Sequence, residues 1–390
     1  MRIQNGEKFI GILFAVIVFL SMGFLISLLV IPFFHQEVER TTFSIYISEN
    51  SDFEKYNFPG SGTEFDPYII ENYTYFEHGI VRIRIYGVNK HFVIRNNQIH
   101  AARGRDGISI GSISVETTKI VNNKIYGSAY DRDYQIGIYV YNMNGCYIFN
   151  NSVYNKDMGI RILSSSNCVV KNNSLINTGR NIEIIDSSET QIENNIMILD
   201  KEKTRYISAA AVYIDESANI LLKNNQLINS GIWFSDSSAN SIVIQNNTIN
   251  DLEIGFYKNQ TDLVFNSSEI YGQLFLVNCT NCLIYNLTIK NSNIGIALYQ
   301  CIYFNCSACN CSYNLYSGLY LSSSLNIIVQ NGTFTNNHVG SRVRYSNSVE
   351  FKSNLFQNNS YGIYMSNSNC TYLYNTFENN KFEDIHIYDY

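Results

Sequence analysis

Three acidic residues recur at one position of a repeated sequence pattern, and they are the first candidates for chemistry. Asp186, Glu216 and Asp236 occupy equivalent positions of consecutive repeats, and Asp215 lies next to Glu216. Carboxylates held this close repel one another, and a shared proton or a bound cation such as Ca²⁺ would relieve the repulsion. We therefore predict Asp186, Glu216 and Asp236 as the catalytic residues if the protein is an enzyme. The alternative is a turn role, since Asp is a good turn residue and other repeats have Ser or Asn here.

A second set of candidates comes from a phrase with alternating apolar residues, as in GIYV, GIRI and GIWF. The third residue of each copy forms a row that is rich in aromatic side chains. An exposed row of this kind could stack against sugar rings, and ordinary stacking between neighbouring strands is the alternative. We predict ligand binding by Tyr139, Arg161, Glu183, Tyr213, Trp233 and Tyr257. Later copies continue the row with Phe275, Ala297, Tyr320, Arg342, Tyr364 and His386.

Both sets depend on a repeat of about 22 residues, which is marked by an Asn-Asn pair between apolar residues, as in IRNNQI and VKNNSL. Asn is a poor strand former that tolerates the left-handed turn conformation, so each pair should mark a turn. Stacked side-chain amides can hydrogen-bond from one repeat to the next. We predict such a ladder from the leading residue of each pair: Asn96, Asn122, Asn150, Asn172, Asn194, Asn224 and Asn246.

A short repeat without helical periodicity predicts one coil of a solenoid. Each coil should hold about three short strands, each paired in parallel with its equivalent about 4.8 Å away. Degenerate copies such as IYNLTI and YFNCSA continue the pattern toward the C-terminus. The sequence therefore predicts an all-β fold, a single right-handed parallel β-helix of about 13 coils over residues 45–390.

The N-terminal region predicts a membrane anchor. Residues 9–34 carry no charge and exceed the roughly 20 residues needed to cross a bilayer. Basic residues before the span and acidic residues after it place the tail 1–8 in the cytoplasm. The linker 35–44 and the β-helix domain would then lie outside the cytoplasmic membrane, in the periplasm or the extracellular space. A cleaved signal peptide is the alternative.

Nine cysteines allow disulfides in that compartment. Several copies carry Cys four residues before the Asn position, where other copies carry Ile, Leu, Val or Phe, which indicates a small buried hydrophobe. Cys146 with Cys168, and Cys282 with Cys301, lie close enough on adjacent coils to form disulfides if oxidised.

A further group, Cys306, Cys309 and Cys311, follows Cys279 and Cys282 with spacing like that of a zinc ribbon. Positions i and i+3 of a strand face opposite ways, so a disulfide that braces the connection before GLYL is favoured over a metal. The metal content stays unknown.

The repeats, and the segment FPGSGTEFDPYIIENYTY at 58–75, resemble right-handed parallel β-helix proteins of the NosD and carbohydrate-binding or sugar-hydrolase type, also described as CASH and PbH1 repeats. The resemblance covers about residues 45–390 and implies that 45–80 is an opening cap and first coil. It implies little about activity, because the fold serves lyases, hydrolases, epimerases, copper-site maturation and structural proteins. The six histidines are scattered, and nothing in the sequence forms a copper cluster.

These observations predict a membrane-anchored β-helix protein that binds polysaccharide or serves as an adhesive or structural surface element. No cofactor is evident in the sequence. A polysaccharide lyase or glycoside hydrolase, which could use Ca²⁺, is one alternative, and a NosD-like accessory for metal-site assembly is another. The connections 126–135 and 200–206 could wall a cleft. A net charge of −6 argues against a nucleic-acid partner. End-to-end self-association and glycosylation of loop sequons such as Asn259 are further expectations.

Overall fold

The computed structural model of the protein describes residues 44–75, 83–101, 106–116, 118–127, 135–200 and 210–388. The predicted membrane span at 9–34 lies outside this part of the chain. Among the residues described, no helix has the length and apolar character that a bilayer crossing requires. Residues 42–390 form one compact unit.

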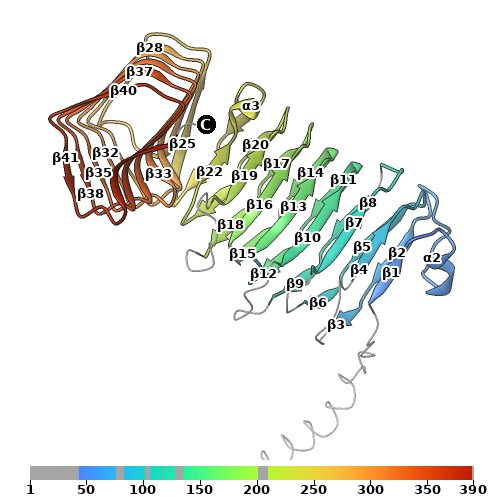
Figure 1. Ribbon diagram of the computed structural model, residues 1–390. Coiled ribbons are helices and arrows are strands. Elements are labelled where there is room, and N and C mark those ends of the chain that lie inside the picture. The colour runs from blue at the N-terminus through green and yellow to red at the C-terminus, as the bar shows by residue number, and fades with distance from the viewer. Residues whose placement is uncertain are drawn as a thin grey trace, which may run out of the picture. The chain divides into compact units, whose positions relative to one another are not determined.

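This unit is a parallel β-solenoid in which the strands of successive coils lie side by side (Figure 1). We divide it into stack one, residues 44–249, and stack two, residues 252–388. Sheets A and B belong to stack one. Sheet A contains β1 (Ile45–Ile47), β4 (Ile83–Tyr86), β7 (Ile108–Gly111), β10 (Ile136–Tyr141), β13 (Met158–Leu163), β16 (Arg180–Ile185), β19 (Val212–Asp215) and β22 (Ile232–Phe234). Sheet B contains β2 (Tyr68–Glu71), β5 (Phe92–Arg95), β8 (Thr118–Val121), β11 (Asn144–Phe149), β14 (Ser166–Lys171), β17 (Gln191–Glu193), β20 (Leu221–Lys223) and β23 (Val243–Gln245).

Sheet C extends through both stacks. Its part in stack one contains β3 (Thr74–Tyr75), β6 (Gln98–His100), β9 (Lys124–Tyr126), β12 (Ser152–Tyr154), β15 (Ser174–Thr178), β18 (Ile196–Leu199), β21 (Gln226–Ile228) and β24 (Thr248–Ile249). Its part in stack two contains β25 (Leu252–Lys258), β27 (Tyr271–Val277), β30 (Ile294–Tyr299), β33 (Ser317–Ser322), β36 (Val339–Arg344), β39 (Tyr361–Ser366) and β42 (Glu383–Tyr388).

Sheets D and E complete stack two. Sheet D contains β26 (Val264–Phe265), β28 (Thr280–Tyr285), β31 (Ile302–Ser307), β34 (Leu325–Gln330), β37 (Asn347–Lys352) and β40 (Cys370–Leu373). Sheet E contains β29 (Thr288–Lys290), β32 (Asn310–Ser312), β35 (Thr333–Thr335), β38 (Leu355–Gln357) and β41 (Thr376–Glu378). Eight strands in sheet B and six in sheet D, one for each coil, confirm the predicted solenoid of about 13 coils.

A short helix, α2 (Asp52–Lys55), lies beside the first coil. It buries Phe53, whose ring stacks on Tyr68 at 4.5 Å and lies 5.8 Å from Phe92. The Asp52 carboxylate accepts the backbone N–H groups of Ser48 and Glu49 and pairs with Lys55. The bond to Lys55 and these N–H groups lower the pKa of Asp52 to about 2.

A tight hairpin separates the two stacks. β24 and β25 pair antiparallel, with Ile249 opposite Leu252, and only Asn250 and Asp251 connect them. Both connecting residues have positive φ, 49° and 66°, as a two-residue type I′ turn requires. The hairpin moves the alternating apolar phrase from sheet A in stack one to sheet C in stack two. The prediction of one continuous β-helix face is therefore wrong.

The last strand of sheet A is completed by a side chain of stack two. Gln273 donates from Nε2 to the backbone oxygen of Ile232 and accepts the Ile232 N–H on Oε1, both at 2.9 Å. Phe234 stacks on Tyr299 at 4.6 Å, and the Tyr299 hydroxyl donates to the Phe234 carbonyl at 2.8 Å. Stack two thus covers the edge of β22 and supplies the hydrogen bonds that a further coil would make.

The asparagine ladder is present, but its members are the second residues of the Asn pairs. Each is at most 1 % exposed. The side-chain oxygen of Asn97 accepts the Tyr73 N–H, and that of every later member accepts from the Asn of the preceding coil. These residues are Asn97, Asn123, Asn151, Asn173, Asn195, Asn225 and Asn247.

One step of the predicted ladder is present on the exposed side, where Asn150 Nδ2 donates to the Asn122 side-chain oxygen at 2.6 Å. Otherwise the predicted ladder residues lie one position before the buried ladder. They adopt the left-handed turn, with φ between 52° and 56°, and precede the true ladder. These turn residues are Asn96, Asn122, Asn150, Asn172, Asn194, Asn224 and Asn246. Only the second Asn of each pair has its side chain enclosed by the coil, so only that side chain must find hydrogen-bond partners in the neighbouring coils.

Other turns use the same device. In stack one, the backbone N–H of each member donates to the hydroxyl of the next along Ser165, Ser187, Ser217 and Ser238. In stack two, a second asparagine ladder follows sheet E through Asn314, Asn337, Asn359 and Asn380.

The cysteines face the interior, and all nine are free thiols. Cys146 and Cys168 are register partners on β11 and β14, as predicted, and both are fully buried. Burial raises the pKa of Cys168 to about 12, so its thiol is protonated at neutral pH.

The predicted pairing of Cys282 with Cys301 is wrong. Cys282 is in register with Phe304 of the next coil. Cys301 occupies the position equivalent to Cys279 on that coil, since the Ile302 N–H donates to the Cys279 carbonyl. The segment CSACNC, and not YFNCSA, is the true equivalent of IYNLTI.

The predicted loop location of the last three cysteines is also wrong. Cys306 lies in β31, Cys311 lies in β32, and Cys309 occupies the ladder position between them. All three are buried in the core of stack two.

The ladder predicts unequal effects within one Asn pair. Asn173→Ala should remove the acceptor of the buried Asn151 backbone N–H and the donor that Asn173 supplies to the Ile148 carbonyl. Each orphaned buried group costs about 1–3 kcal/mol, so we expect a loss of at least about 2 kcal/mol in the free energy of unfolding. Asn172→Gly keeps the left-handed turn and should change it by less than about 1 kcal/mol. Urea denaturation measures both, and equal losses would contradict the assignment of the ladder.

The junction gives a second prediction. Gln273→Ala should expose the Ile232 N–H, so that its amide exchanges faster with deuterium while amides at the centre of sheet A stay protected. Gln245→Ala, at an exposed position on sheet B, is the control. Unchanged exchange at Ile232 would show that Gln273 does not hold the edge.

Candidate functional site

The predicted ligand-binding row forms in stack one. Ser109, Tyr139, Arg161 and Glu183 are register partners on neighbouring strands of sheet A, and the row continues through Tyr213 and Trp233. Its members are stacked as the repeat predicts.

Most charged groups and aromatic rings of this row are engaged in ion pairs, cation–π contacts or stacking with neighbouring side chains. Arg161 pairs with Glu183 at 2.9 Å, and Arg180 also pairs with Glu183. The Arg180 guanidinium lies 3.9 Å from the centre of the Tyr213 ring, which stacks on Trp233 at 4.5 Å. Glu183 is 2 % exposed and Trp233 is 6 % exposed. Little of either side chain is therefore open to a sugar ring.

The row does not continue as one exposed face into stack two. Phe256, not Tyr257, is in register with Phe275, and Tyr257 packs against the core of stack two. Phe275 and Ala297 are fully buried and Tyr320 is 1 % exposed. The predicted place of Tyr257 in the row, and the predicted exposure of these three residues, are wrong because this part of sheet C lies at the junction. The predicted cleft walls at 126–135 and 200–206 lie outside the described residues except at their ends, 126–127, 135 and 200.

Two of the three predicted catalytic carboxylates meet. Asp186 and Glu216 occupy left-handed turns on adjacent coils, and contact with Asp186 raises the pKa of the exposed Glu216. Asp236 begins the short helix α3 (Asp236–Ala239), and its Oδ2 accepts from Ser322 at 2.6 Å and Ser323 at 3.2 Å. Asp236 is thus engaged with stack two. Among the described residues, no group of three His, Cys, Asp or Glu side chains could hold a metal ion. A Ca²⁺ site remains a prediction.

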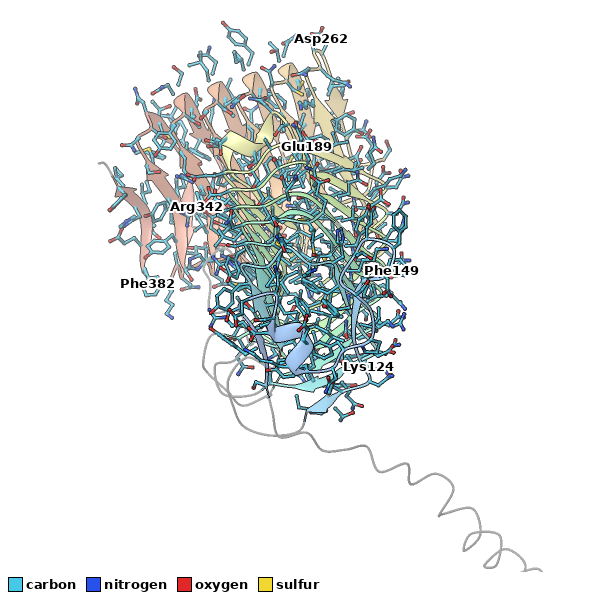
Figure 2. The ribbon with its side chains drawn as sticks, turned by 90° about the vertical axis from the view of Figure 1, so that its right-hand side faces the viewer. Lys124, Phe149, Glu189, Asp262, Arg342 and Phe382 are labelled. Carbon is cyan, nitrogen blue, oxygen red and sulfur yellow. The ribbon has the colours of Figure 1, made fainter. Side chains whose placement is uncertain are left out.

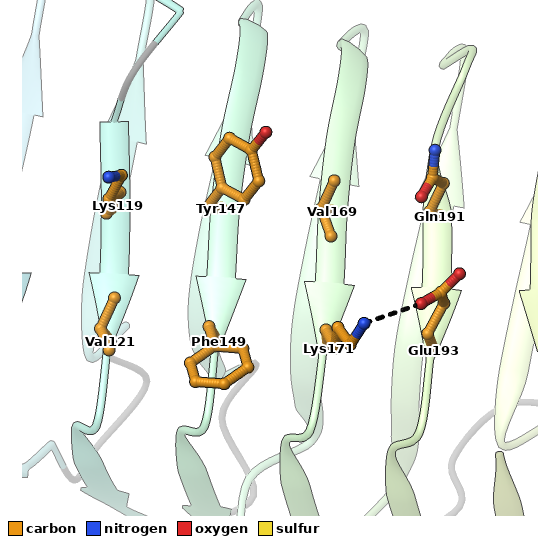
Figure 3. A pocket seen from close by; sticks show the side chains of 8 residues that line it. All are labelled: Lys119, Val121, Tyr147, Phe149, Val169, Lys171, Gln191 and Glu193. Atoms are coloured by element: carbon orange, nitrogen blue, oxygen red, sulfur yellow. Dashed lines mark hydrogen bonds and ion pairs between the residues drawn. The ribbon is translucent and has the colours of Figure 1, made fainter. Parts of the chain in front are cut away.

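An open groove of about 760 Å³ lies on the outward face of sheet B (Figure 3). Two rows of side chains line it, one from each outward position of four neighbouring strands. The rows are Lys119, Tyr147, Val169 and Gln191, and Val121, Phe149, Lys171 and Glu193.

The groove combines exposed rings with ionic groups. Tyr147 is 47 % exposed and Phe149 is 38 % exposed, both on β11. Lys171 pairs with Glu193 at 3.1 Å, while Lys119 has no ion-pair partner among the described residues. The surface therefore offers two aromatic side chains, amide and carboxylate acceptors, and one unpaired cation.

The sequence analysis missed this groove because it followed only the alternating apolar phrase. A signal was present one and three residues before each leading Asn. Tyr147 and Phe149 make β11 the only strand of sheet B with aromatic residues at both positions. The core-facing Cys146 and Ile148 alternate with them, so both rings point outward.

The contact between the two turn carboxylates gives a prediction. The folded-state pKa of Glu216 is raised, so ionised Glu216 opposes folding and protonated Glu216 does not. Glu216→Gln should therefore raise the urea midpoint at neutral pH, and this gain should fade as the pH falls through the pKa of Glu216. Glu54→Gln, at another exposed acid, is the control. A gain that persists in acid would contradict carboxylate repulsion as its cause.

Two protein-family models match the chain. The model described as periplasmic copper-binding protein (NosD) matches residues 91–268, mainly in stack one. The model described as right handed beta helix region matches residues 272–389 in stack two. No curated protein sequence matches the chain.

A search of solved structures finds several similar chains at low identity. The mannuronan C-5 epimerase AlgE4 A-module of Azotobacter vinelandii is 12% identical over 88% of this chain and 98% of that one, with a TM-score of 0.36. The surface adhesin PfbA of Streptococcus pneumoniae is 12% identical over 88% and 93%, with a TM-score of 0.32. The catalytic domain of a GH87 alpha-1,3-glucanase is 13% identical over 81% and 63%, with a TM-score of 0.38.

The parallel coils, their polar ladders and the two family matches lead to one conclusion. The chain is a parallel β-solenoid that contains a NosD family-model domain in stack one and a right-handed β-helix family-model domain in stack two.

Proposed function

We propose that this protein is a membrane-tethered surface protein that binds polysaccharide along the sheet B groove. Tethering rests on the uncharged segment 9–34, which is long enough to span a bilayer. The solenoid would then lie outside the cytoplasmic membrane and present its outward faces to glycans.

The observation that carries the proposal is the pair of exposed rings on β11. Tyr147 and Phe149 both line the groove, and both are exposed to solvent. Exposed aromatic rings suit the apolar faces of sugar rings, and nearby amide and charged groups suit sugar hydroxyls. The groove crosses four coils at about 4.8 Å each, so a linear polymer could contact several coils in turn.

Polysaccharide binding, unlike catalysis, does not require acidic or basic catalytic side chains in the groove. Its one acid, Glu193, is engaged by Lys171, and the paired carboxylates Asp186 and Glu216 lie on a turn outside it. Binding therefore requires fewer assumptions than catalysis does. The carboxylate contact is nevertheless the specific feature that favours a lyase or hydrolase as the second candidate.

The test is retention of the full chain in a panel of immobilised polysaccharides, with and without Ca²⁺. Tyr147→Ala and Phe149→Ala should each weaken binding by about 1 kcal/mol, or roughly fivefold in Kd, because each removes a stacking surface. The double variant should weaken it further. The same samples are scored for chain cleavage.

Tyr285→Ala is the matched control, because Tyr285 is 41% exposed and precedes a left-handed Asn on sheet D, just as Phe149 does on sheet B. It should bind like the wild type. Equal loss in all three variants, or no retention of any polysaccharide by the wild type, would contradict the proposal. Cleavage that disappears in Glu216→Ala would instead support the enzyme.

A further inference from the structure

Arg342 occupies an unusual position on the outward face of sheet C in stack two, where Figure 2 labels it. It is in register with Tyr320 on one side and with Tyr364 on the other. Its guanidinium lies 4.6 Å from the ring centre of Tyr316 and 4.2 Å from that of Tyr364. The planar cation is thus held between two tyrosine rings.

This cation lacks a counter-ion in the described structure. Arg342 is 9% exposed, and its Nε is buried without an acceptor. It forms no hydrogen bond and no ion pair with any described residue. Arg161 and Arg95, by contrast, pair with Glu183 and Glu71.

The energetics of this arrangement are unbalanced. Removing an ion from water is costly even after relaxation. A desolvated cation–π contact offsets only part of that cost, and the buried Nε–H adds the cost of an unmade hydrogen bond. The two tyrosines therefore orient the guanidinium without neutralising it.

The surroundings of Arg342 are also electropositive. Arg344 follows two residues later on the same face and is half-buried. Burial and the charge of Arg342 lower the pKa of His338. The acids in this region are engaged elsewhere: Glu383 accepts from His386 at 2.6 Å, and Asp236 accepts from Ser322.

We propose that Arg342 and Arg344 form an oxyanion-binding site, and that the site takes the carboxylate or sulfate group of an acidic sugar. Arginine binds two oxygens of a carboxylate or of a tetrahedral oxyanion through two parallel N–H donors, and these donors are unused in Arg342. The half-buried rings of Tyr364 and Tyr361 border the site and could contact the sugar. The inference that the ligand is a sugar rests on the proposed glycan-binding function. The inference that the ligand carries an oxyanion rests on the unpaired guanidinium of Arg342.

The experiment measures binding of the full chain to polygalacturonate, dextran sulfate and neutral dextran at one ionic strength. Arg342→Gln should weaken binding of at least one anionic polymer by tenfold or more and leave dextran unchanged. Arg344→Gln, at a more exposed position, should act in the same direction with less effect on folding. Arg95→Gln is the matched control, because Arg95 is already paired with Glu71 at 2.6 Å. Which anionic polymer responds distinguishes carboxylate from sulfate.

Modification with phenylglyoxal, mapped by mass spectrometry, keeps the test valid if Arg342→Gln does not fold. Polygalacturonate or dextran sulfate should protect Arg342 in the wild type, and dextran should not.

The proposal is overturned if anionic polymers bind both arginine variants as they bind the wild type and give no protection. The two sites are separate if Tyr147→Ala weakens binding of all polysaccharides alike while the arginine variants weaken binding of anionic polymers only. The reverse pattern would reject the groove and keep the oxyanion site.

Discussion

The structure depends on the requirement that every polar group enclosed by a coil finds a partner in the next coil. Backbone pairing meets this requirement along the strands, but at the turns the chain must supply side chains of the right length. Asn173 shows the solution: its amide donates to Asn195 and to the Ile148 carbonyl, and its oxygen accepts from Asn151. Because each member completes the one before it, the ladder is cooperative and cannot be shortened at one coil without leaving a buried group unpaired.

Periodicity predicted the stacking of coils because strand pairing forces equivalent residues of successive repeats into register. It could not distinguish the two residues of an Asn pair. Both tolerate a turn, but the first takes the left-handed conformation and the second is enclosed, as Asn172 and Asn173 show. A shift of one residue also decides which side chain faces the interior, so Tyr257 moved from the predicted row to the core.

The junction between the stacks was not predicted, for a related reason. The repeat persists on both sides, so a periodic pattern contains no sign of a change of sheet. The local signal was Asn250–Asp251, two residues that both tolerate positive φ, between two short apolar runs. Burial of Phe275 followed from its ring contact with Phe234 of β22, and Tyr320 packs against Tyr299, which also contacts Phe234; no local rule contains these tertiary contacts. The outward rings of β11, in contrast, were readable from strand alternation once the register was known.

The two arginine clusters show how the same fold treats charge in different ways. Around Glu183, two guanidinium groups meet a buried carboxylate, so their charges are compensated within the protein. Around Arg342, the rings that would accept a sugar are present, but the carboxylate is not. The scaffold tolerates both because its stability comes from the ladders and the apolar interior, so outward residues can vary without loss of the coil. An uncompensated charge on such a face is therefore a feature that the fold does not require, and a ligand is the simplest physical reason for it.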